Sequence, residues 1–262
     1  MSSSRKAPLW LTVYSVLFLG FLYVPVFLLP VFSLNDSKII AFPLRGLTFD
    51  WYRDLASSPQ LLIALANSIK IALTVSVLAT CLGTVGAWAV TRYRFAGKKL
   101  AVGFIMLPIV APLIVLAVAL FTMFMAAGVR LSLLTVGFGR LIVCVPFSFS
   151  VMLSRLEGFD PDLVRASRDL GEGVLATFLR VVLPLSMPGI ISSLLLCFTI
   201  SFDEFVVSFF LASSDATLPV YIWSQLRFPE RLPSVLALGS LILIFSILLV
   251  GAGEWFRRSR QP

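Results

Sequence analysis

Two adjacent carboxylates, Asp203 and Glu204, lie inside a long apolar stretch of the sequence, Pro188–Leu211. A carboxylate inside a membrane is costly, so each should face a partner or a water-filled cavity. Adjacent helical residues diverge by about 100°, so the two cannot share a face. Asp203 has apolar neighbours on its face, which favours a buried structural partner. Glu204 is a candidate cavity-lining residue, because it continues a polar stripe formed by Ser193, Cys197, Ser201, Glu204 and Ser208.

Both carboxylates have a structural alternative, a salt bridge inside the helix bundle with Arg140 or with Lys70. The cavity interpretation suits a cationic solute, because an acidic lining lowers the cost of moving positive charge through low-dielectric material. On a continuous helix over Pro188–Leu211, Asp203 would lie about 12 Å from the outer end. The sequence leaves both interpretations open.

Other kinds of chemistry lack their motifs. The chain has no histidine, no phosphate loop of the form G-x-x-x-x-G-K-[ST], and neither G-x-S-x-G nor H-E-x-x-H. We therefore expect no enzyme activity, no ATP hydrolysis, no metal and no cofactor in this chain. Its three cysteines, Cys81, Cys144 and Cys197, sit in apolar runs and are expected to behave as small buried hydrophobes.

The composition places these residues in a membrane. Hydrophobic residues make up 59% of the 262 and charged residues only 13%, whereas soluble domains average about 45–50% and about 25%. We therefore predict an all-α membrane protein with one domain, residues 1–262, and a core over about 61–256. A spanning helix needs about 20 apolar residues, and six stretches qualify: Leu9–Leu34 (an N-terminal anchor), Leu61–Val90, Leu100–Ala127, Leu133–Leu153, Pro188–Leu211 and Pro233–Phe256.

Charge distribution predicts the orientation of these spans. Segments 1–8, 91–99, 154–187 and 257–262 carry 13 Lys and Arg residues, including Arg5, Lys6, Arg257, Arg258 and Arg260, against 6 in the opposite loops. The positive-inside rule therefore places both termini in the cytoplasm. The net charge of +8 needs no nucleic acid to explain it. Within the second span, Ala79, Gly83 and Ala87 lie four residues apart, a spacing that lets helices approach closely in lipid.

The loop over residues 154–187 is predicted to hold a short amphipathic helix. Asp160 and Pro161 are typical of a helix start, and Gly171 of a helix end. A second helical stretch follows over Val174–Val182. The first helix either docks into a partner or lies on the lipid interface, and its residues at helical spacing are Leu163, Ala166, Ser167 and Leu170.

The segment Val164–Gly171, followed by Leu183-Pro184, resembles the coupling loop of ABC importer permeases. With Ser154–Phe159, Ser201–Ser208 and Leu218–Ile222, the chain most resembles the second permease of spermidine/putrescine importers. The resemblance implies the type I permease fold in a bacterial inner membrane. It also implies polyamine import, for which the candidate pathway residues are Asp203, Glu204, Ser201 and Ser208. It further implies an ATPase contact through Leu163, Arg165, Ala166, Ser167, Asp169, Leu170 and Gly171.

The resemblance also implies several partners: a second permease, a dimeric ATPase that binds ATP and Mg²⁺, and an extracytoplasmic substrate-binding protein. Loops 35–60 and 212–232, with Trp51, Tyr52, Pro219 and Tyr221, would meet the binding protein. One departure is that Arg165 replaces the family's usual glutamate and Ser167 its second alanine. Alternatives are another cargo (ferric iron, thiamine, an opine or a sugar), a proton-coupled secondary carrier that titrates Glu204, or a membrane scaffold.

Overall fold

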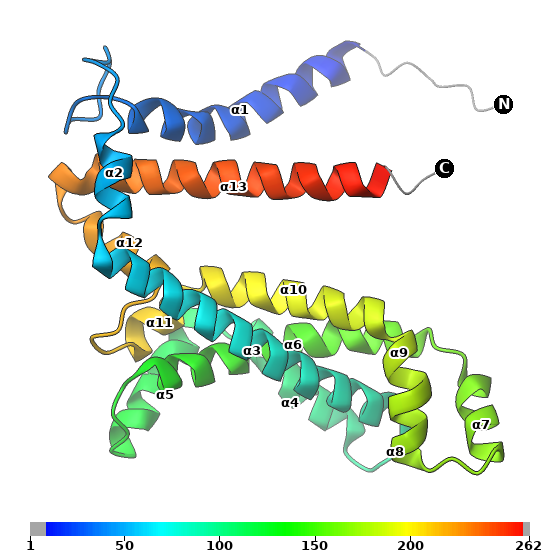
Figure 1. Cartoon of the computed structure of the whole chain (residues 1–262). Coiled ribbons are helices and arrows are strands. Elements are labelled where there is room, and N and C mark those ends of the chain that lie inside the picture. The colour runs from blue at the N-terminus through cyan, green and yellow to red at the C-terminus, as the bar shows by residue number, and fades with distance from the viewer. Residues whose placement is uncertain (1–8, 259–262) are drawn as a thin grey trace. The chain divides into compact units, whose positions relative to one another are not determined.

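The computed structural model describes residues 9–258, except for the side chains of residues 161, 245 and 249–258, and is helical almost throughout (Figure 1). This part of the chain has no β-strand, only an isolated antiparallel bridge between Asn35 and Leu47. Arg5, Lys6 and Arg260, which entered the prediction of orientation, lie outside the described residues, as do the side chains of Arg257 and Arg258. The chain divides into two compact units, residues 1–59 with 222–262 and residues 60–221.

The first unit is built on two long helices, α1 (Leu9–Ser33) and α13 (Leu232–Arg258), which pack together. Helix α13, the last of the predicted spans, thus lies beside the N-terminal helix. A short helix, α2 (Asp50–Ala56), also packs on α13. Hydrogen bonds to the buried Asn35 fix the segment between α1 and α2. The Asn35 side-chain oxygen accepts from the Arg45 backbone N–H, and the Asn35 backbone carbonyl accepts from the Trp51 indole, each at 3.0 Å.

The second unit is centred on three helices, α3 (Pro59–Arg92), α6 (Leu133–Glu157) and α10 (Met187–Asp203). Their buried apolar side chains form one core cluster, and α10 packs along α6 (Figure 1). Around it lie α4 (Lys98–Val110), α5 (Leu113–Ala126), α7 (Pro161–Asp169), α8 (Val174–Thr177), a π-helical turn (Phe178–Val182), α9 (Leu183–Leu185) and α11 (Val206–Leu211). A further helix, α12 (Leu218–Gln225), and a 3₁₀ turn (Pro229–Arg231) lead to α13.

Small residues bring the three central helices together. A Cβ built on Gly83 would lie 2.2 Å from the Ser148 Oγ and 2.7 Å from the Phe149 backbone nitrogen, so α3 and α6 touch there. Ala79 and Ala87, four residues to either side, are fully buried. The predicted close approach along this row is confirmed. Buried hydroxyl groups also connect the three helices. The hydroxyl oxygens of Thr80 (α3) and Ser193 (α10) lie 3.1 Å apart, and the Ser193 hydroxyl donates to that of Ser148 (α6) at 2.8 Å.

The cysteines fall into two classes. Cys144 of α6 and Cys197 of α10 are fully buried, and each thiol contacts the other residue's carbonyl oxygen, at 3.7 and 3.5 Å. Cys81 of α3 is exposed, contrary to the expectation that all three would be buried. The difference follows from helix geometry, because Cys81 lies beside Ala79 and Thr80 in sequence but turns away from the face that packs on α6 and α10.

By length and composition, four helical segments of the described chain can cross a membrane: α1, α3, α6 and Pro229–Leu248. The predicted third span, Leu100–Ala127, is not one helix, because α4 and α5 meet at 103°. Pro112 lacks a backbone N–H, and Ala111 before it is extended (φ −70°, ψ 135°), the conformation that a following proline favours. A second bent pair, Val174–Leu185 with α10, meets at 73°. Counting each pair as one span gives six.

Candidate functional site

The predicted fifth span is interrupted at the two carboxylates. Helix α10 ends at Asp203, Glu204 has extended backbone angles (φ −72°, ψ 117°), and α11 begins at Val206. The 12 Å depth expected for Asp203 on a continuous helix therefore does not apply. The Glu204 carboxylate accepts hydrogen bonds from the backbone N–H groups of Val207 at 2.8 Å and Ser208 at 3.1 Å. It thus caps the first turn of α11, where helical N–H groups have no intrahelical acceptor.

Arg140 of α6 joins both sides of this break. Its side chain is fully buried and donates to the Glu204 carbonyl oxygen at 2.8 Å and to the Ser208 Oγ at 2.6 and 3.0 Å. Its Nε lies 3.7 Å from Oε2 of Glu204, so the two charges form a buried ion pair. We call Arg140, Glu204 and Ser208 the α10–α11 bracket. A charge pair with this many hydrogen bonds offsets much of the cost of burying each ion.

The two carboxylates have environments opposite to those expected. Glu204, expected to line a cavity, is 7% exposed and paired with Arg140, which is the structural alternative left open by the sequence. Asp203, expected to have a buried partner, is exposed at the end of α10. The polar stripe faces inward, since its members are all buried: Ser193, Cys197, Ser201, Glu204 and Ser208.

Two polar groups in or near the bracket have no hydrogen-bond partner within the described structure, Nη1 of Arg140 and Oγ of Ser201.

Lys70, the other candidate partner from the sequence, takes no part in the bracket. Its side chain is exposed on α3, and it forms no ion pair with any described residue. The sequence named Arg140 and Lys70 as candidate partners, but periodicity could not choose between them, because Arg140 contacts Glu204 across 64 residues of sequence.

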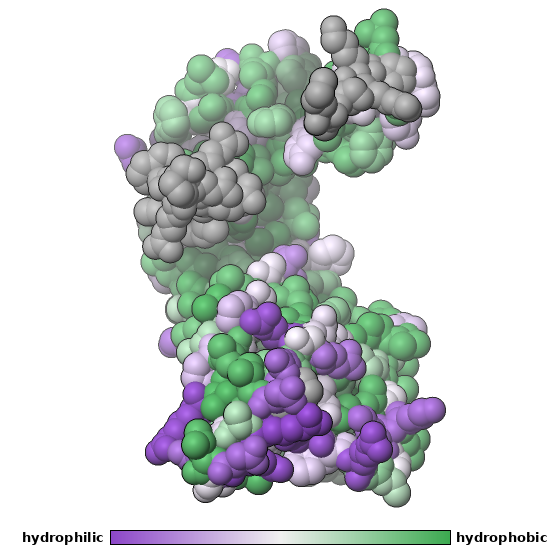
Figure 2. All heavy atoms as spheres, turned by 90° about the vertical axis from the view of Figure 1, so that its right-hand side faces the viewer, coloured by the Kyte–Doolittle hydropathy of each residue, from purple (hydrophilic) through white to green (hydrophobic). Residues whose placement is uncertain are grey.

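The predicted loop helix is present as α7. The Asp160 side chain accepts a hydrogen bond from the backbone N–H of Asp162 at 2.9 Å, as expected of an N-cap, and Gly171 ends the helix with φ +87°. That left-handed conformation favours glycine. The next stretch is helical to Leu185, three residues beyond the predicted end, with a π-helical turn at Phe178–Val182. Hydrophilic residues gather on the end of this unit that carries α7 and α8 (Figure 2).

Helix α7 has two apolar sides with different environments. Val164 is buried with Phe178 and Val182, and Ser167 is 3.1 Å from the Thr177 hydroxyl. These contacts hold α7 against α8 and the π-helical turn. Leu163, Ala166 and Leu170 are exposed, Leu170 by 85%. Of the residues expected to contact an ATPase, Ser167 therefore lies on the inner side.

The charged residues of α7 are all exposed. Arg165 pairs with Asp162 at 2.6 Å in an exposed ion pair, and Asp169 is exposed near the helix end. Arg180 and Glu172 form a second ion pair nearby. Arg165, which replaces the family's usual glutamate, thus pairs with a carboxylate of its own helix.

Comparison with known proteins identifies the family. The model of the "Binding-protein-dependent transport system inner membrane component" family matches residues 79–261. The chain belongs to this family. It is therefore a permease subunit of the ABC importer class and a multi-pass inner-membrane protein.

Relatives with known names cover almost the whole chain. The spermidine/putrescine transport system permease protein PotC of Escherichia coli K12 is 34% identical over 242 residues, which is 92% of this chain and 91% of PotC. The putrescine transport system permease protein PotI of the same strain is 31% identical over 259 residues, covering 96% and 91%. PotC of Haemophilus influenzae is 34% identical over 243 residues, covering 92% and 94%.

A solved structure supports the fold. A chain of a bacterial ABC transporter involved in the import of the acidic polysaccharide alginate matches with a TM-score of 0.72 and 16% sequence identity. The match covers 97% of this chain and 99% of the other. The predicted type I permease fold is confirmed, and this likeness is one of fold alone.

Proposed function

We propose that this permease forms half of the translocation pathway of an ATP-driven importer for polyamines, spermidine or putrescine. The observation that carries the cargo is the identity of 34% and 31% to PotC and PotI over more than nine-tenths of the chain. The proposed partners are a second permease, an extracytoplasmic binding protein and a dimeric ATPase. ATP and Mg²⁺ bind to the ATPase, since this sequence has no phosphate loop.

Within that function, we assign substrate contact to Asp203. Its carboxylate is exposed at the end of α10, while that of Glu204 is occupied by Arg140 and by the α11 N-terminus. An exposed carboxylate at the end of a membrane helix must face protein or water rather than lipid. It lowers the barrier for a polyamine cation. Glu204, Ser201 and Ser208 act indirectly, by shaping the break that presents Asp203.

Coupling to the ATPase is assigned to the outer side of α7. Leu163, Ala166 and Leu170 form an apolar face that no described residue of this chain covers, although Val164 and Ser167 fix the helix from behind. An apolar face on a helix held by a buried inner side is suited to a preformed groove in a partner. The neighbouring Gly171 sets the sharp end of this helix.

The test is ATP-dependent uptake of labelled putrescine and spermidine by the complete complex in proteoliposomes. We expect uptake by the wild type, a loss of at least tenfold for Asp203→Asn, and little change for Glu230→Gln, which removes another exposed carboxylate. Wild-type failure with both polyamines would refute the cargo. Normal uptake by Asp203→Asn would refute its contact with substrate. Uptake driven by a proton gradient without ATP would instead favour a secondary carrier.

A further inference from the structure

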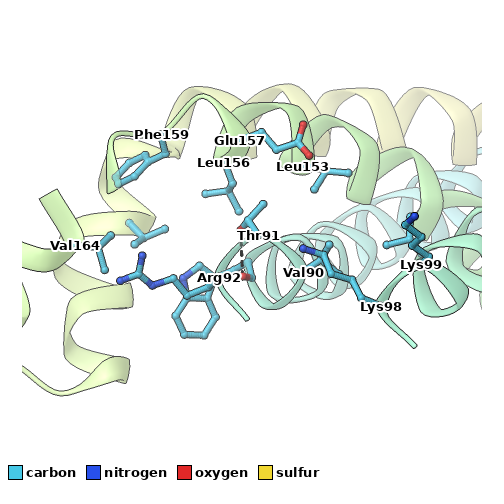
Figure 3. A pocket seen from close by; sticks show the side chains of 13 residues that line it. Val90, Thr91, Arg92, Lys98, Lys99, Leu153, Leu156, Glu157, Phe159 and Val164 are labelled. Atoms are coloured by element: carbon cyan, nitrogen blue, oxygen red, sulfur yellow. Dashed lines mark hydrogen bonds between the residues drawn. The ribbon is translucent and has the colours of Figure 1, made fainter. Parts of the chain in front are cut away.

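The second unit contains a cavity unrelated to the carboxylates. It lies between the ends of α3 and α6, the start of α4 and the loop before α7, and has a volume of about 810 Å³. Its inner wall is apolar, formed by Trp88, Val90, Val102, Leu153 and Leu156. Figure 3 shows Val90, Leu153 and Leu156 around the cavity, with Phe159 and Val164 at its left-hand end.

Three cations line the same cavity. Arg92 comes from the end of α3, and Lys98 and Lys99 come from the first turn of α4 (Figure 3). Glu157 is the one acidic lining residue, so the lining carries a net charge of +2. None of these four forms an ion pair with another described residue, although ion pairs occur nearby in the coupling loop. The cavity thus combines an apolar wall with three cations that outnumber its one carboxylate.

This combination selects an amphiphilic anion. A soluble anion would leave the apolar wall facing water, and a neutral apolar ligand would leave the three cations without a counter-charge. The wall lies on membrane-spanning helices, and the cations lie where these helices end, in the segments predicted to be cytoplasmic. Basic pockets between membrane helices at that surface are suited to acidic lipid headgroups.

We propose that this cavity binds an anionic phospholipid of the cytoplasmic leaflet. The phosphate is held by Arg92, Lys98 and Lys99, and an acyl chain lies against Val102, Leu153 and the neighbouring apolar side chains. Val164 of α7 and Val182 of the π-helical turn also line the cavity. The bound lipid therefore touches the segment that holds α7 in place, and it supports the position of that helix.

The experiment measures lipid bound to the purified complex by native mass spectrometry, in detergent with phosphatidylglycerol or phosphatidylcholine as the probe. Phosphatidylglycerol should bind at least tenfold more tightly than phosphatidylcholine to the wild type. The triple variant Arg92→Gln/Lys98→Gln/Lys99→Gln should lose that preference. The matched control, Lys38→Gln/Arg45→Gln/Arg130→Gln, removes the same charge from exposed positions outside the cavity and should keep the preference.

A second variant tests the apolar wall. Val102→Trp fills the cavity without changing its charge and should also lower phosphatidylglycerol binding at least tenfold. Equal losses in the triple variant and its control would overturn the proposal in favour of bulk electrostatics. Competition by millimolar inorganic phosphate, with no effect of Val102→Trp, would overturn it in favour of a free anion. Absence of bound phosphatidylglycerol from the wild-type complex, with weaker ATPase binding by the triple variant, would overturn the proposal in favour of a protein segment in the cavity. These readouts do not depend on transport or on cargo.

Discussion

At the scale of single residues, the decisive contact is between Arg140 and Glu204. Both side chains are buried, and their charges pair with each other. Their further hydrogen bonds are made with Ser208 and with the backbone of the α10–α11 break. Removing one partner leaves a lone charge in a low-dielectric environment, which costs more than the intact pair contributes. The pair therefore behaves as a unit in which single substitutions are more harmful than the double one.

We predict that Arg140→Met destabilises the protein by about 3–5 kcal/mol, because it leaves the Glu204 carboxylate buried without its counter-ion. The measurement is the unfolding temperature and the yield of monodisperse protein in detergent. The double variant Arg140→Met/Glu204→Gln should recover much of the loss, since no buried charge remains. Arg180→Ala is the control, because the Arg180 side chain is exposed in its ion pair with the half-buried Glu172, and such a pair contributes about 1 kcal/mol or less. A double variant as unstable as the single one would contradict this account.

At the scale of helices, the close contact of α3 with α6 depends on the absence of a side chain at Gly83. We predict that Gly83→Ala lowers stability by about 1–3 kcal/mol, because the new methyl group would meet Ser148 and the backbone of Phe149. The displaced Ser148 would also weaken its hydrogen bond with Ser193. The measurement is again the unfolding temperature.

Gly103→Ala is the matched control for this substitution. A Cβ on Gly103 of α4 would have no neighbour within 4 Å, so its unfolding temperature should equal that of the wild type or exceed it. Similar effects of the two substitutions would show that helix propensity, rather than interhelical contact, decides the outcome.

Helix α7 provides a prediction about assembly. Leu163→Ala/Leu170→Ala removes two exposed apolar side chains and should lower the affinity for the ATPase at least tenfold, because each leucine buried in a partner contributes on the order of 1.5–3 kcal/mol. The check is co-purification with the ATPase, followed by titration. Arg168→Gln, an exposed residue of the same helix, should bind normally. Unchanged binding by the double leucine variant would place the contact elsewhere.

At the scale of the whole molecule, the sequence predicted the helical membrane class, the positions of most spans and the short loop helix. These depend on local signals: long apolar runs, Asp160-Pro161 and Gly171. The break at α4–α5 also had a local signal, in Pro112. The break at Glu204 had none, because neither Glu204 nor Phe205 is a helix breaker. It depends on Arg140, which is far away in sequence and reaches the break only in the folded bundle.

The same limit explains why the environments of the two carboxylates are the opposite of those expected. A helical projection grouped Glu204 with side chains that are all buried, although α10 ends before it, and the part of this stripe on α10 faces α6 and α3. Polarity on one face of a membrane helix predicts a polar neighbour. It does not tell whether that neighbour is a protein side chain or water.

The orientation in the membrane remains a prediction from charge, and fusions can test it. A fluorescent protein fused after the C-terminus should fluoresce, because it would fold in the cytoplasm. Alkaline phosphatase fused after Ser57, in a loop predicted to lie outside, should be active, and the same enzyme fused after Gly173 should be inactive. The reversed pattern would invert the predicted topology.

Because Cys81 is exposed, its reaction with a thiol reagent can report whether water reaches this face of α3. Cys144 and Cys197 are enclosed by each other's helices, so a maleimide reagent should modify Cys81 alone. A maleimide reagent modifies a cysteine efficiently only where water and the reagent reach the thiol. Its labelling rate in the assembled complex therefore distinguishes a face of α3 that meets water from one that meets lipid or a second permease, with no engineered cysteine.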